Sequence, residues 1–413
     1  MLEEMLQRGR TAQKSLSGSN GKQRNQVLLE MERLVRHRAE DILRVNREDV
    51  ANAVAGGLSG PLVKRLMLDE GKLAGLAEGL RWVSDLPDPL GRGLGQWRLN
   101  NGLRLETVRV PLGVIGLIYE SRPGVTVEAP GLTIKSGNAL ILRGGHEALE
   151  TNRMLAALWR HALKRMGLPE DAVQLIENSD RQYAIGLMHL QGLDLLIPRG
   201  GAGLIQTVVK EATVPVIETG VGNCHLYVDK EADLEMAIRI LRDGKVGNPA
   251  VCNALETVLI HRDIKEEFLP RAFQALHNDG VIWHADDEVR AIVPDAVAAS
   301  ESDWAGEYLS LDIAAHIVGD LNEAIAHIAH YGTSHSEAVV TESYPVGQEF
   351  CDRVDAAVVY WNASTRFTDG FQFGYGAEVG ISTQKLHARG PMGLEALTTT
   401  KTIAWGTGQT RDF

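Results

Sequence analysis

Apolar side chains recur at helix spacing through the first ninety residues of the chain. One stripe consists of Leu28, Leu29, Met31, Leu34 and Val35, set among charged residues. Positions three and four apart share one face of a helix, so the stripe predicts an amphipathic helix that packs on a neighbour. Glycines and a proline interrupt the pattern at 56–61, and helix is expected to resume to about residue 82.

Residues 98–108 follow a different pattern, in which polar and apolar side chains alternate around Asn101-Gly102. An Asn-Gly pair flanked by such alternation is a strong hairpin signal. A hairpin of two strands is barely stable alone in water. The segment Trp97–Val110 is therefore expected to pack on something else, such as another subunit. Residues 396–405 also alternate and predict an edge strand.

From Gly113 onward, short apolar runs alternate with helical patterns. A first series predicts strands at 113–119, 139–142, 173–176, 194–197 and 214–217, with helices at 125–135, 147–166 and 204–211. A second series predicts strands at 257–261, 281–283, 311–318, 338–340 and 356–360, with helices at 234–242, 268–277 and 321–330. Strands that alternate with helices indicate parallel βαβ units with right-handed crossovers. The fold class is therefore α/β.

Composition narrows the function classes. A chain of 413 residues suggests about two or three domains. The net charge of −12 argues against nucleic acid as the main partner. No apolar run is long enough to cross a bilayer, and the polar N-terminus has no apolar signal core, so a cytoplasmic location is expected. Three cysteines give no disulfide framework, and no cysteine or histidine cluster has metal-ligand spacing.

Two predicted strand ends carry glycines beside an arginine. One is Arg143-Gly144-Gly145, followed by His146, and the other is Arg199-Gly200-Gly201. Glycine lets a phosphate approach the backbone, and a helix N-terminus presents free N–H groups. Each run alone is equally well a tight strand-to-helix turn, but two in one sheet favour a phosphate-bearing ligand. The Gly-X-Gly-X-X-Gly fingerprint and a P-loop are missing, which argues against a standard Rossmann mode.

Cys252 is the candidate nucleophile. It lies in a run of small residues after Pro249, just before an apolar strand that begins near Thr257. A thiol on a bend can face a cleft together with neighbouring N–H groups, an arrangement that suits covalent acyl chemistry. The alternative is a small buried side chain, as most free cysteines are. Cys224 and Cys351 lie in patterns typical of a core strand and a helix.

Longer motifs resemble a known family. Residues 111–116, 119–123 and 135–138 and the run Val251-Cys252-Asn253-Ala254 resemble the aldehyde dehydrogenase superfamily. Residues 197–201, 362–370 and 381–395 resemble, more narrowly, the γ-glutamyl phosphate reductases. The resemblance covers nearly the whole chain.

The resemblance implies an aldehyde dehydrogenase-like fold of three parts. An NADP-binding domain comprises residues 1–96 and 111–228, with 362–390 returning to it. A catalytic domain with Cys252 comprises 229–361. A small β oligomerisation arm comprises 97–110 and 391–413, so a homo-oligomer is expected, together with a transient contact with glutamate 5-kinase.

The implied reaction is reduction of L-glutamate 5-phosphate by NADPH to L-glutamate 5-semialdehyde and phosphate, the second step of proline biosynthesis from glutamate. Cys252 would carry the glutamyl group as a thioester. Two alternatives stay open: a hydrolytic aldehyde dehydrogenase with Glu218 as its base, and a catalytically silent binding protein on this fold.

The resemblance also implies the site residues. The catalytic group is Cys252, with Ser121 as a second oxyanion donor and Asn253 beside the thiol. The cofactor-binding residues are Arg143, Gly144, Gly145, Arg199, Gly200, Gly201, Glu218 and Glu307. The substrate-binding residues are Arg122, His335, Ser364, Thr365 and Arg366. His146 stands where NAD-preferring relatives carry a glutamate, which favours NADP(H). Asn248 stands where reductases often have an arginine, so Arg122 or Arg366 would bind phosphate.

Overall fold

The chain divides into two compact units in the computed structural model, which describes residues 1–58 and 60–411. The first unit comprises the described residues of Met1–Thr219, Gly374–Gly380 and Met392–Phe413, and the second comprises Gly220–Phe373 and Ile381–Pro391. The segment 220–228 was expected in the first domain but belongs to the second, because its strand pairs there. The returning segment is shorter than the predicted 362–390. Asp412 and Phe413, the end of the predicted arm, lie outside the described residues.

The first unit is built around a parallel sheet whose strand order, among the described residues, is β5-β4-β3-β6. The strands are β3 (Val114–Tyr119), β4 (Ala139–Arg143), β5 (Val173–Leu175) and β6 (Leu195–Arg199). All four match predicted strands. The fifth prediction, at 214–217, is wrong: only an isolated bridge joins Val216 to Leu196. Pro215 has no N–H to donate, so a regular ladder cannot continue through it.

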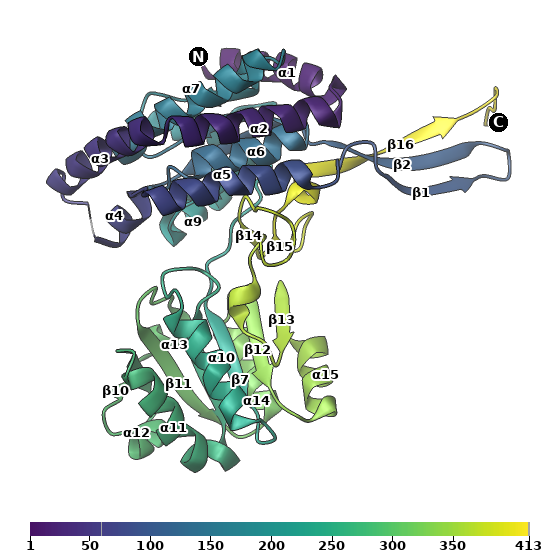
Figure 1. Cartoon of the computed structure of the whole chain (residues 1–413). Coiled ribbons are helices and arrows are strands. Elements are labelled where there is room, and N and C mark those ends of the chain that lie inside the picture. Colours follow the sequence, from purple (N-terminus) through teal and green to yellow (C-terminus); the bar gives the residue numbers. More distant parts are fainter. Residues whose placement is uncertain (59, 412–413) are drawn as a thin grey trace. The chain divides into compact units, whose positions relative to one another are not determined.

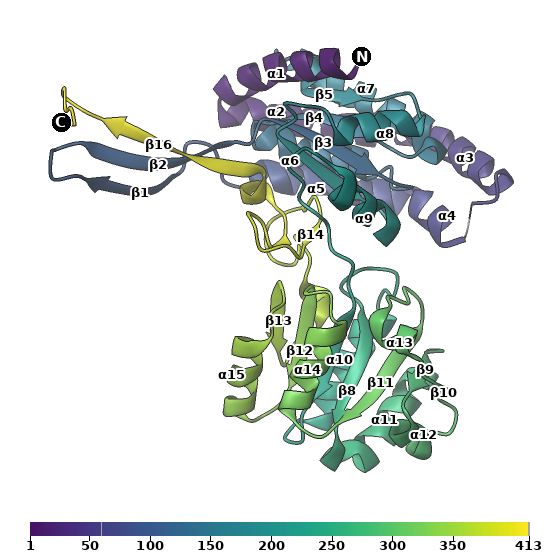
Figure 2. The same ribbon diagram turned by 180° about the vertical axis from the view of Figure 1, so that it is seen from behind.

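Helices cover both faces of this sheet. They are α1 (Leu2–Gly18), α2 (Gly21–His37), α3 (Ala39–Ala55), α4 (Gly60–Leu66), α5 (Glu70–Asp85), α6 (Val125–Lys135), α7 (Leu149–Arg165), α8 (Arg181–Met188) and α9 (Ala202–Glu211), with 3₁₀ turns at His146–Ala148, Glu170–Ala172 and Leu394–Leu397. Figure 2 shows α1, α8 and α9 on one face, where Leu6, Leu187 and Val208 pack on strand residues such as Ile118. Helices α6 and α7 lie on the other face, and α2, α3 and α5 pack on them (Figure 1). The predicted N-terminal helices are confirmed.

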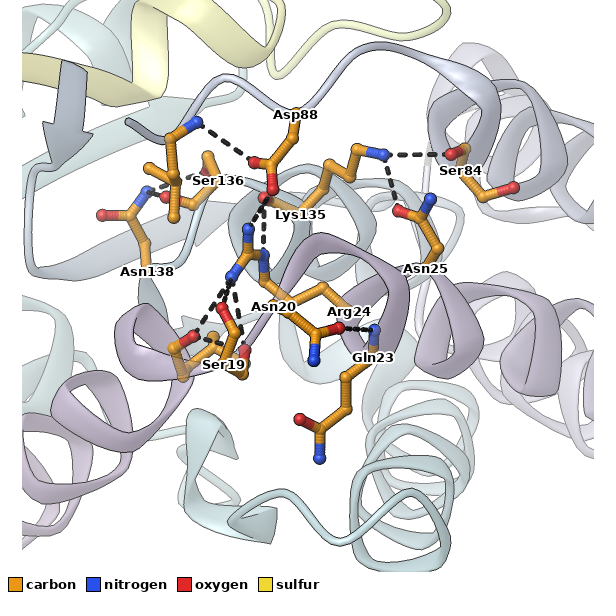
Figure 3. Close-up of polar contacts among 12 residues, drawn as sticks. Ser19, Asn20, Gln23, Arg24, Asn25, Ser84, Asp88, Lys135, Ser136 and Asn138 are labelled. Carbon is orange, nitrogen blue, oxygen red and sulfur yellow. Dashed lines mark hydrogen bonds and ion pairs between the residues drawn. The ribbon is translucent and has the colours of Figure 1, made fainter. Parts of the chain in front are cut away.

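A buried cation fastens the N-terminal helices to the sheet layer (Figure 3). Arg24 is 1% exposed; its Nε donates to the carbonyl of Lys135 at 3.2 Å, and its Nη2 lies 2.6 Å from an oxygen of Asp88. The Lys135 ammonium in turn donates to the carbonyl of Ser84 at 2.9 Å and to Asn25. Burial lowers the pKa of Lys135. Since a buried charge is costly without partners, these contacts fix α2 and α5 against α6.

A three-stranded antiparallel sheet extends from the first unit (Figure 1). It has the order β1-β2-β16 and consists of β1 (Gly93–Arg98), β2 (Arg104–Pro111) and β16 (Thr398–Trp405). The predicted hairpin is confirmed, and Gly102 adopts a φ of +87° in its turn. All six residues of β1 are exposed. Such an unpaired edge can accept a further strand; its role in oligomerisation stays a prediction.

The second unit contains a parallel sheet with the order β10-β9-β11-β8-β7-β12-β13 among the described residues. Its strands are β7 (Cys224–Val228), β8 (Leu255–His261), β9 (Ile282–Ala285), β10 (Val297–Ala298), β11 (Asp312–Val318), β12 (Ser336–Val340) and β13 (Val358–Trp361). Side chains alternate between the faces: Leu226 and Val258 join one core, and Tyr227 and Leu259 join the other. A short pair, β14 (Ile381–Ser382) and β15 (Gly390–Pro391), also belongs to this unit.

The helices of the second unit are α10 (Leu234–Val246), α11 (Lys265–His277), α12 (Asp287–Ile292), α13 (Glu301–Ala305), α14 (Leu321–Tyr331) and α15 (Tyr344–Arg353), with 3₁₀ turns at Arg262–Ile264 and Thr365–Phe367. Helices α10 and α11 cover one face, and α14 and α15 cover the other. The predicted helices at 234–242, 268–277 and 321–330 are confirmed, and the first is four residues longer. In the part of the chain that the structure describes, no helix combines the length and apolarity that a membrane span requires.

Candidate active site

Cys252 lies in the loop that connects α10 to β8, at the amino end of the sheet in the second unit. Its carbonyl oxygen accepts a hydrogen bond from the Cys224 thiol, with a sulfur–oxygen distance of 3.3 Å. The backbone of Gly222, just before β7, passes directly over the same carbonyl. A Cβ added at Gly222 would lie 2.8 Å from the Cys252 Cα and closer still to its carbonyl oxygen. The Cys252 carbonyl is therefore in close contact with two residues of one segment, Gly222 and Cys224.

Asn253 ties the cysteine loop to the segment 364–368. Its Nδ2 donates to the carbonyls of Thr368 at 2.9 Å and Arg366 at 3.2 Å, while its Oδ1 accepts from the Arg366 guanidinium. The Thr365 hydroxyl donates to the Asn253 carbonyl at 2.8 Å. Asn253 is only 5% exposed. These bonds make Asn253 and Thr365 supports of the loop, since their polar atoms are used within the protein. The Ser364 oxygen likewise accepts from the Arg366 N–H.

His335 is fully buried beside Cys224. Its Nδ1 lies 2.9 Å from the Ser336 hydroxyl and 3.7 Å from the Cys224 sulfur. Burial lowers the pKa of His335 to about 4, so its imidazole is neutral at pH 7. Burial also raises the pKa of Cys224 well above its usual value, which keeps that thiol protonated and inert. His335 therefore lies beside the thiol that contacts the Cys252 carbonyl, and its role in substrate binding stays a prediction.

Glu307 belongs to the second unit, as the predicted catalytic domain 229–361 implied, and its role as a cofactor ligand stays a prediction. Its Oε1 accepts from the Gly222 N–H at 2.7 Å. The carboxylate therefore helps to place the glycine that lies on the Cys252 carbonyl. Glu218, the other acidic residue of that set, is half-buried near the end of the first unit.

A cavity of about 440 Å³ opens in the first unit between the ends of β3 and β4 and helices α8 and α9. Its apolar wall includes Ile118, Ile185 and Leu204, and its polar lining includes the guanidinium groups of Arg143 and Arg181, the imidazole of His146 and the carboxylate of Glu120. Its volume is typical of small-molecule sites. The Arg143 Nε is buried without a hydrogen-bond partner among the described residues. An apolar wall for a flat base, with two guanidinium groups beside it for phosphates, fits a dinucleotide.

The glycines of the two strand ends have different neighbours. A Cβ on Gly200 would lie 2.9 Å from the carboxyl carbon of Glu120, whose Oε2 accepts the Gly201 N–H at 3.0 Å. Glu120 thus takes one of the free N–H groups at the start of α9. A Cβ on Gly144 would lie 3.0 Å from the Tyr119 ring, and one on Gly145 would overlap the Glu147 carboxylate. The Tyr119 ring restricts the space at Gly144, whereas the obstacle at Gly145 is the end of a flexible side chain.

Ser121 has a φ of +42° and is almost fully buried. Its N–H and its hydroxyl both donate to Glu147 Oε1, at 2.7 and 2.6 Å. A hydroxyl already donated to a carboxylate has no second proton to offer an oxyanion. The structure therefore gives Ser121 a local role, and the Cys252 N–H remains the stronger candidate donor.

A second cavity of the first unit, of about 340 Å³, gathers several cations. Arg65, Lys72, Arg122 and Arg199 line it, with one carboxylate, Glu128. Arg199 thus lies with Arg122 and not in the cavity of Arg143, although we predicted it on the cofactor side. Its Nε is buried without a hydrogen-bond partner among the described residues. The excess of positive charge suits a ligand with more than one anionic group.

Sequence reasoning missed Gly222 and Arg181. Gly222 could have been noticed as the last glycine of Gly220-Val221-Gly222 before a core strand, since an isolated glycine there often marks a close backbone approach. Arg181 is the first residue of α8, a helix whose residues show no strong hydrophobic periodicity. Within the residues that the structure describes, no group of three or more His, Cys, Asp or Glu side chains could hold a metal ion.

Comparison with known proteins agrees with this architecture. The family model described as Aldehyde dehydrogenase family matches residues 1–290. A protein of Carboxydothermus hydrogenoformans named gamma-glutamyl phosphate reductase is 53% identical over 408 residues, which cover 98% of each sequence. One of the same name from Moorella thermoacetica is 53% identical over 406 residues, covering 98% of this chain and 97% of the relative.

A solved structure is also similar to this chain. The crystal structure of gamma-glutamyl phosphate reductase from Thermotoga maritima has 45% sequence identity to this chain, and the match covers 99% of both chains with a TM-score of 0.95. Fold and sequence therefore point to the same group of proteins.

Proposed function

Because the chain belongs to the aldehyde dehydrogenase family, and within it to the γ-glutamyl phosphate reductases, we propose that this oxidoreductase reduces L-glutamate 5-phosphate with NADPH through a Cys252 thioester. The products would be L-glutamate 5-semialdehyde and phosphate, as in the second step of proline biosynthesis. The observation that carries the proposal is the packing of the Cys252 loop. The Cys252 carbonyl contacts Gly222 and Cys224, and the Asn253 side chain donates a hydrogen bond to the carbonyl of Thr368.

In the proposed mechanism, the Cys252 thiolate attacks the acyl carbon and the C–O bond to phosphate breaks. Phosphate leaves with the electron pair of that bond, and the glutamyl group stays on sulfur as a thioester. The Cys252 N–H is the proposed donor to the oxyanion. NADPH, when bound, supplies the hydride that reduces the thioester. The aldehyde is released when the carbon–sulfur bond breaks and Cys252 is regenerated as thiolate.

The cavity of Arg143 is the proposed cofactor site. Its apolar wall would receive the adenine, and Arg143 and Arg181 would face the phosphates. The His146 side chain lies at the rim and is 82% exposed. A neutral or cationic imidazole there tolerates a 2′-phosphate, whereas a carboxylate would repel it. We propose NADP(H) over NAD(H) on that ground.

We expect His146→Glu to raise the KM for NADP⁺ about tenfold, which corresponds to about 1.4 kcal/mol of added repulsion, with the KM for NAD⁺ unchanged. The matched control is His161→Glu on the exposed face of α7, outside this cavity. Initial rates with each coenzyme measure both constants. An equal change in both KM values would refute the placement of the 2′-phosphate beside His146.

The cavity of Arg122 and Arg199 is the proposed binding region for the anionic groups of the substrate. Arg366 is the other proposed phosphate ligand, although its guanidinium already donates to Asn253. In the cell, the proposal includes a cytoplasmic homo-oligomer assembled through the sheet β1-β2-β16, and a transient contact with the kinase that makes the acyl phosphate.

The reverse reaction tests the proposed chemistry. With glutamate 5-semialdehyde and NADP⁺, continued NADPH formation beyond the first turnover should require phosphate or arsenate, because an oxyanion must take the acyl group from Cys252 before the thiolate can react again. Turnover at the full rate without either anion would refute the acyl-phosphate assignment and favour a hydrolytic enzyme with Glu218 as base. Absorbance at the NADPH band follows both cases.

A further inference from the structure

The proposed mechanism leaves two fully buried charges of the second unit without a role. Lys245 lies in the last turn of α10, and Glu256 is the second residue of β8; both side chains are 0% exposed. The Lys245 ammonium lies 2.6 Å from Glu256 Oε2. Because α10 leads into the Cys252 loop and β8 leads out of it, this pair joins the two ends of the loop.

Glu256 also reaches a second loop. Its Oε1 accepts the Leu309 N–H at 3.3 Å, and Lys245 Nζ lies 5.7 Å from the centre of the Tyr308 ring. Leu309 adopts a φ of +54°, a conformation that a branched side chain keeps only when its surroundings impose it. The pair therefore holds the segment 307–309 as well as the ends of the Cys252 loop.

The contacts close into a circuit around the nucleophile. Glu307, two residues before Leu309, accepts the Gly222 N–H at 2.7 Å. Gly222 in turn lies on the Cys252 carbonyl. The circuit thus runs from the loop ends, through Glu256 and the segment 307–309, back to the main chain of the reactive cysteine.

Stability alone is a poor reason for this pair. Burial lowers the pKa of Lys245 and raises that of Glu256, and each partner opposes the shift of the other. Replacing a buried ion pair by apolar residues of similar volume is often neutral or stabilising. The residues that follow in β8, such as Val258 and Leu259, are apolar and fully buried. A charged residue in such a strand is better explained by what it positions.

We propose that Lys245 and Glu256 form a positioning pair that holds the Cys252 loop and the segment 307–309 in the arrangement in which the thiol reacts. The inference rests on the proposed function for the chemistry that the thiol performs. The claim that the pair holds these two segments in place depends only on contacts within the second unit.

Two double variants test the pair, because a single substitution would leave an unpaired buried charge. K245M/E256L removes both links, and K245M/E256Q keeps an oxygen that can accept the Leu309 N–H. We expect kcat of the phosphate-dependent reverse reaction to fall about 100-fold in the first and less in the second, with KM for the semialdehyde and for NADP⁺ within about twofold of wild type. The matched control is Arg242→Met, which removes an exposed ion pair of the same helix with Asp279 and should change neither constant.

Hydrogen exchange gives a second readout that needs no substrate. In K245M/E256L, amides of 247–254 and 306–310 should exchange at least about tenfold faster, while those of 257–261 stay protected. Unchanged exchange in both loops would overturn the proposal, as would faster exchange with a wild-type kcat.

If K245M/E256L does not fold, the same measurements on K245M/E256Q test the proposal by the same criteria. A wild-type enzyme that is inactive with phosphate, semialdehyde and NADP⁺ would refute the proposed function. The exchange rates would still show whether Lys245 and Glu256 hold the two loops in place.

Discussion

Cys252→Ala is expected to lower kcat by at least about 10⁴-fold, because the proposed reaction has no other group to carry the acyl chain. Unfolding should change little, since Cys252 is half-buried and the change removes one sulfur atom. The rate is measured in the reverse direction with phosphate, semialdehyde and NADP⁺, and the unfolding temperature by calorimetry.

The other two thiols supply contrasts. Cys351 lies in α15, where burial and the neighbouring Asp352 raise its pKa. Cys351→Ala should therefore leave kcat within about twofold of wild type, as expected of a substitution away from the site. Cys224→Ala removes a hydrogen bond to the Cys252 carbonyl and should have an intermediate effect. A Cys252→Ala enzyme with activity close to that of wild type would exclude the thioester.

Gly222→Ala is expected to be the most damaging change of a residue with no reactive group. Its methyl would lie 2.8 Å from the Cys252 Cα and closer to the carbonyl, distances that real Cβ atoms essentially never show. The obstacle is backbone and not the end of a flexible side chain, so either the cysteine loop or the start of β7 must move. A displacement of about 1 Å at the nucleophile lowers kcat about 100-fold, and overpacking costs about 3 kcal/mol.

The matched control is Gly79→Ala in α5, where an added Cβ meets nothing within 4 Å. Alanine is the better helix former, so this variant should gain about 0.5–1 kcal/mol of unfolding free energy. Denaturant unfolding and initial rates compare the two variants. If Gly222→Ala retained both wild-type stability and wild-type kcat, the close approach to Cys252 would be wrong.

Local patterns predicted the sheets well because the hydrophobic pattern of a strand is contained within a few consecutive residues. The continuous apolar run at 113–119 became β3, buried on both faces, and the alternation around Asn101-Gly102 became the hairpin of β1 and β2. The strand predicted at 214–217 failed because one proline without an N–H outweighs the apolar residues around it.

The candidate site was harder to predict, because its contacts join residues far apart in the sequence. The residues next to Cys252 in the sequence were enough to predict it as the nucleophile. The close approach of Gly222 and the hydrogen bonds from Asn253 to 366–368 depend on tertiary packing, which those neighbours do not reveal. Arg143 and Arg199 are each the last residue of a strand, yet they line different cavities. The burial of His335 likewise depends on strands that pair across the sheet, which no local pattern reports.

The most direct test of the thioester is to trap it. L-Glutamate 5-phosphate, generated in place by a kinase and ATP, is mixed with the enzyme without NADPH, and the acid-quenched protein is digested and analysed by mass spectrometry. The expected result is a glutamyl group on the peptide that contains Cys252, absent from Cys252→Ala and lost when NADPH is added before the quench. A glutamyl label on another side chain, with Cys252 unmodified, would contradict the proposed chemistry.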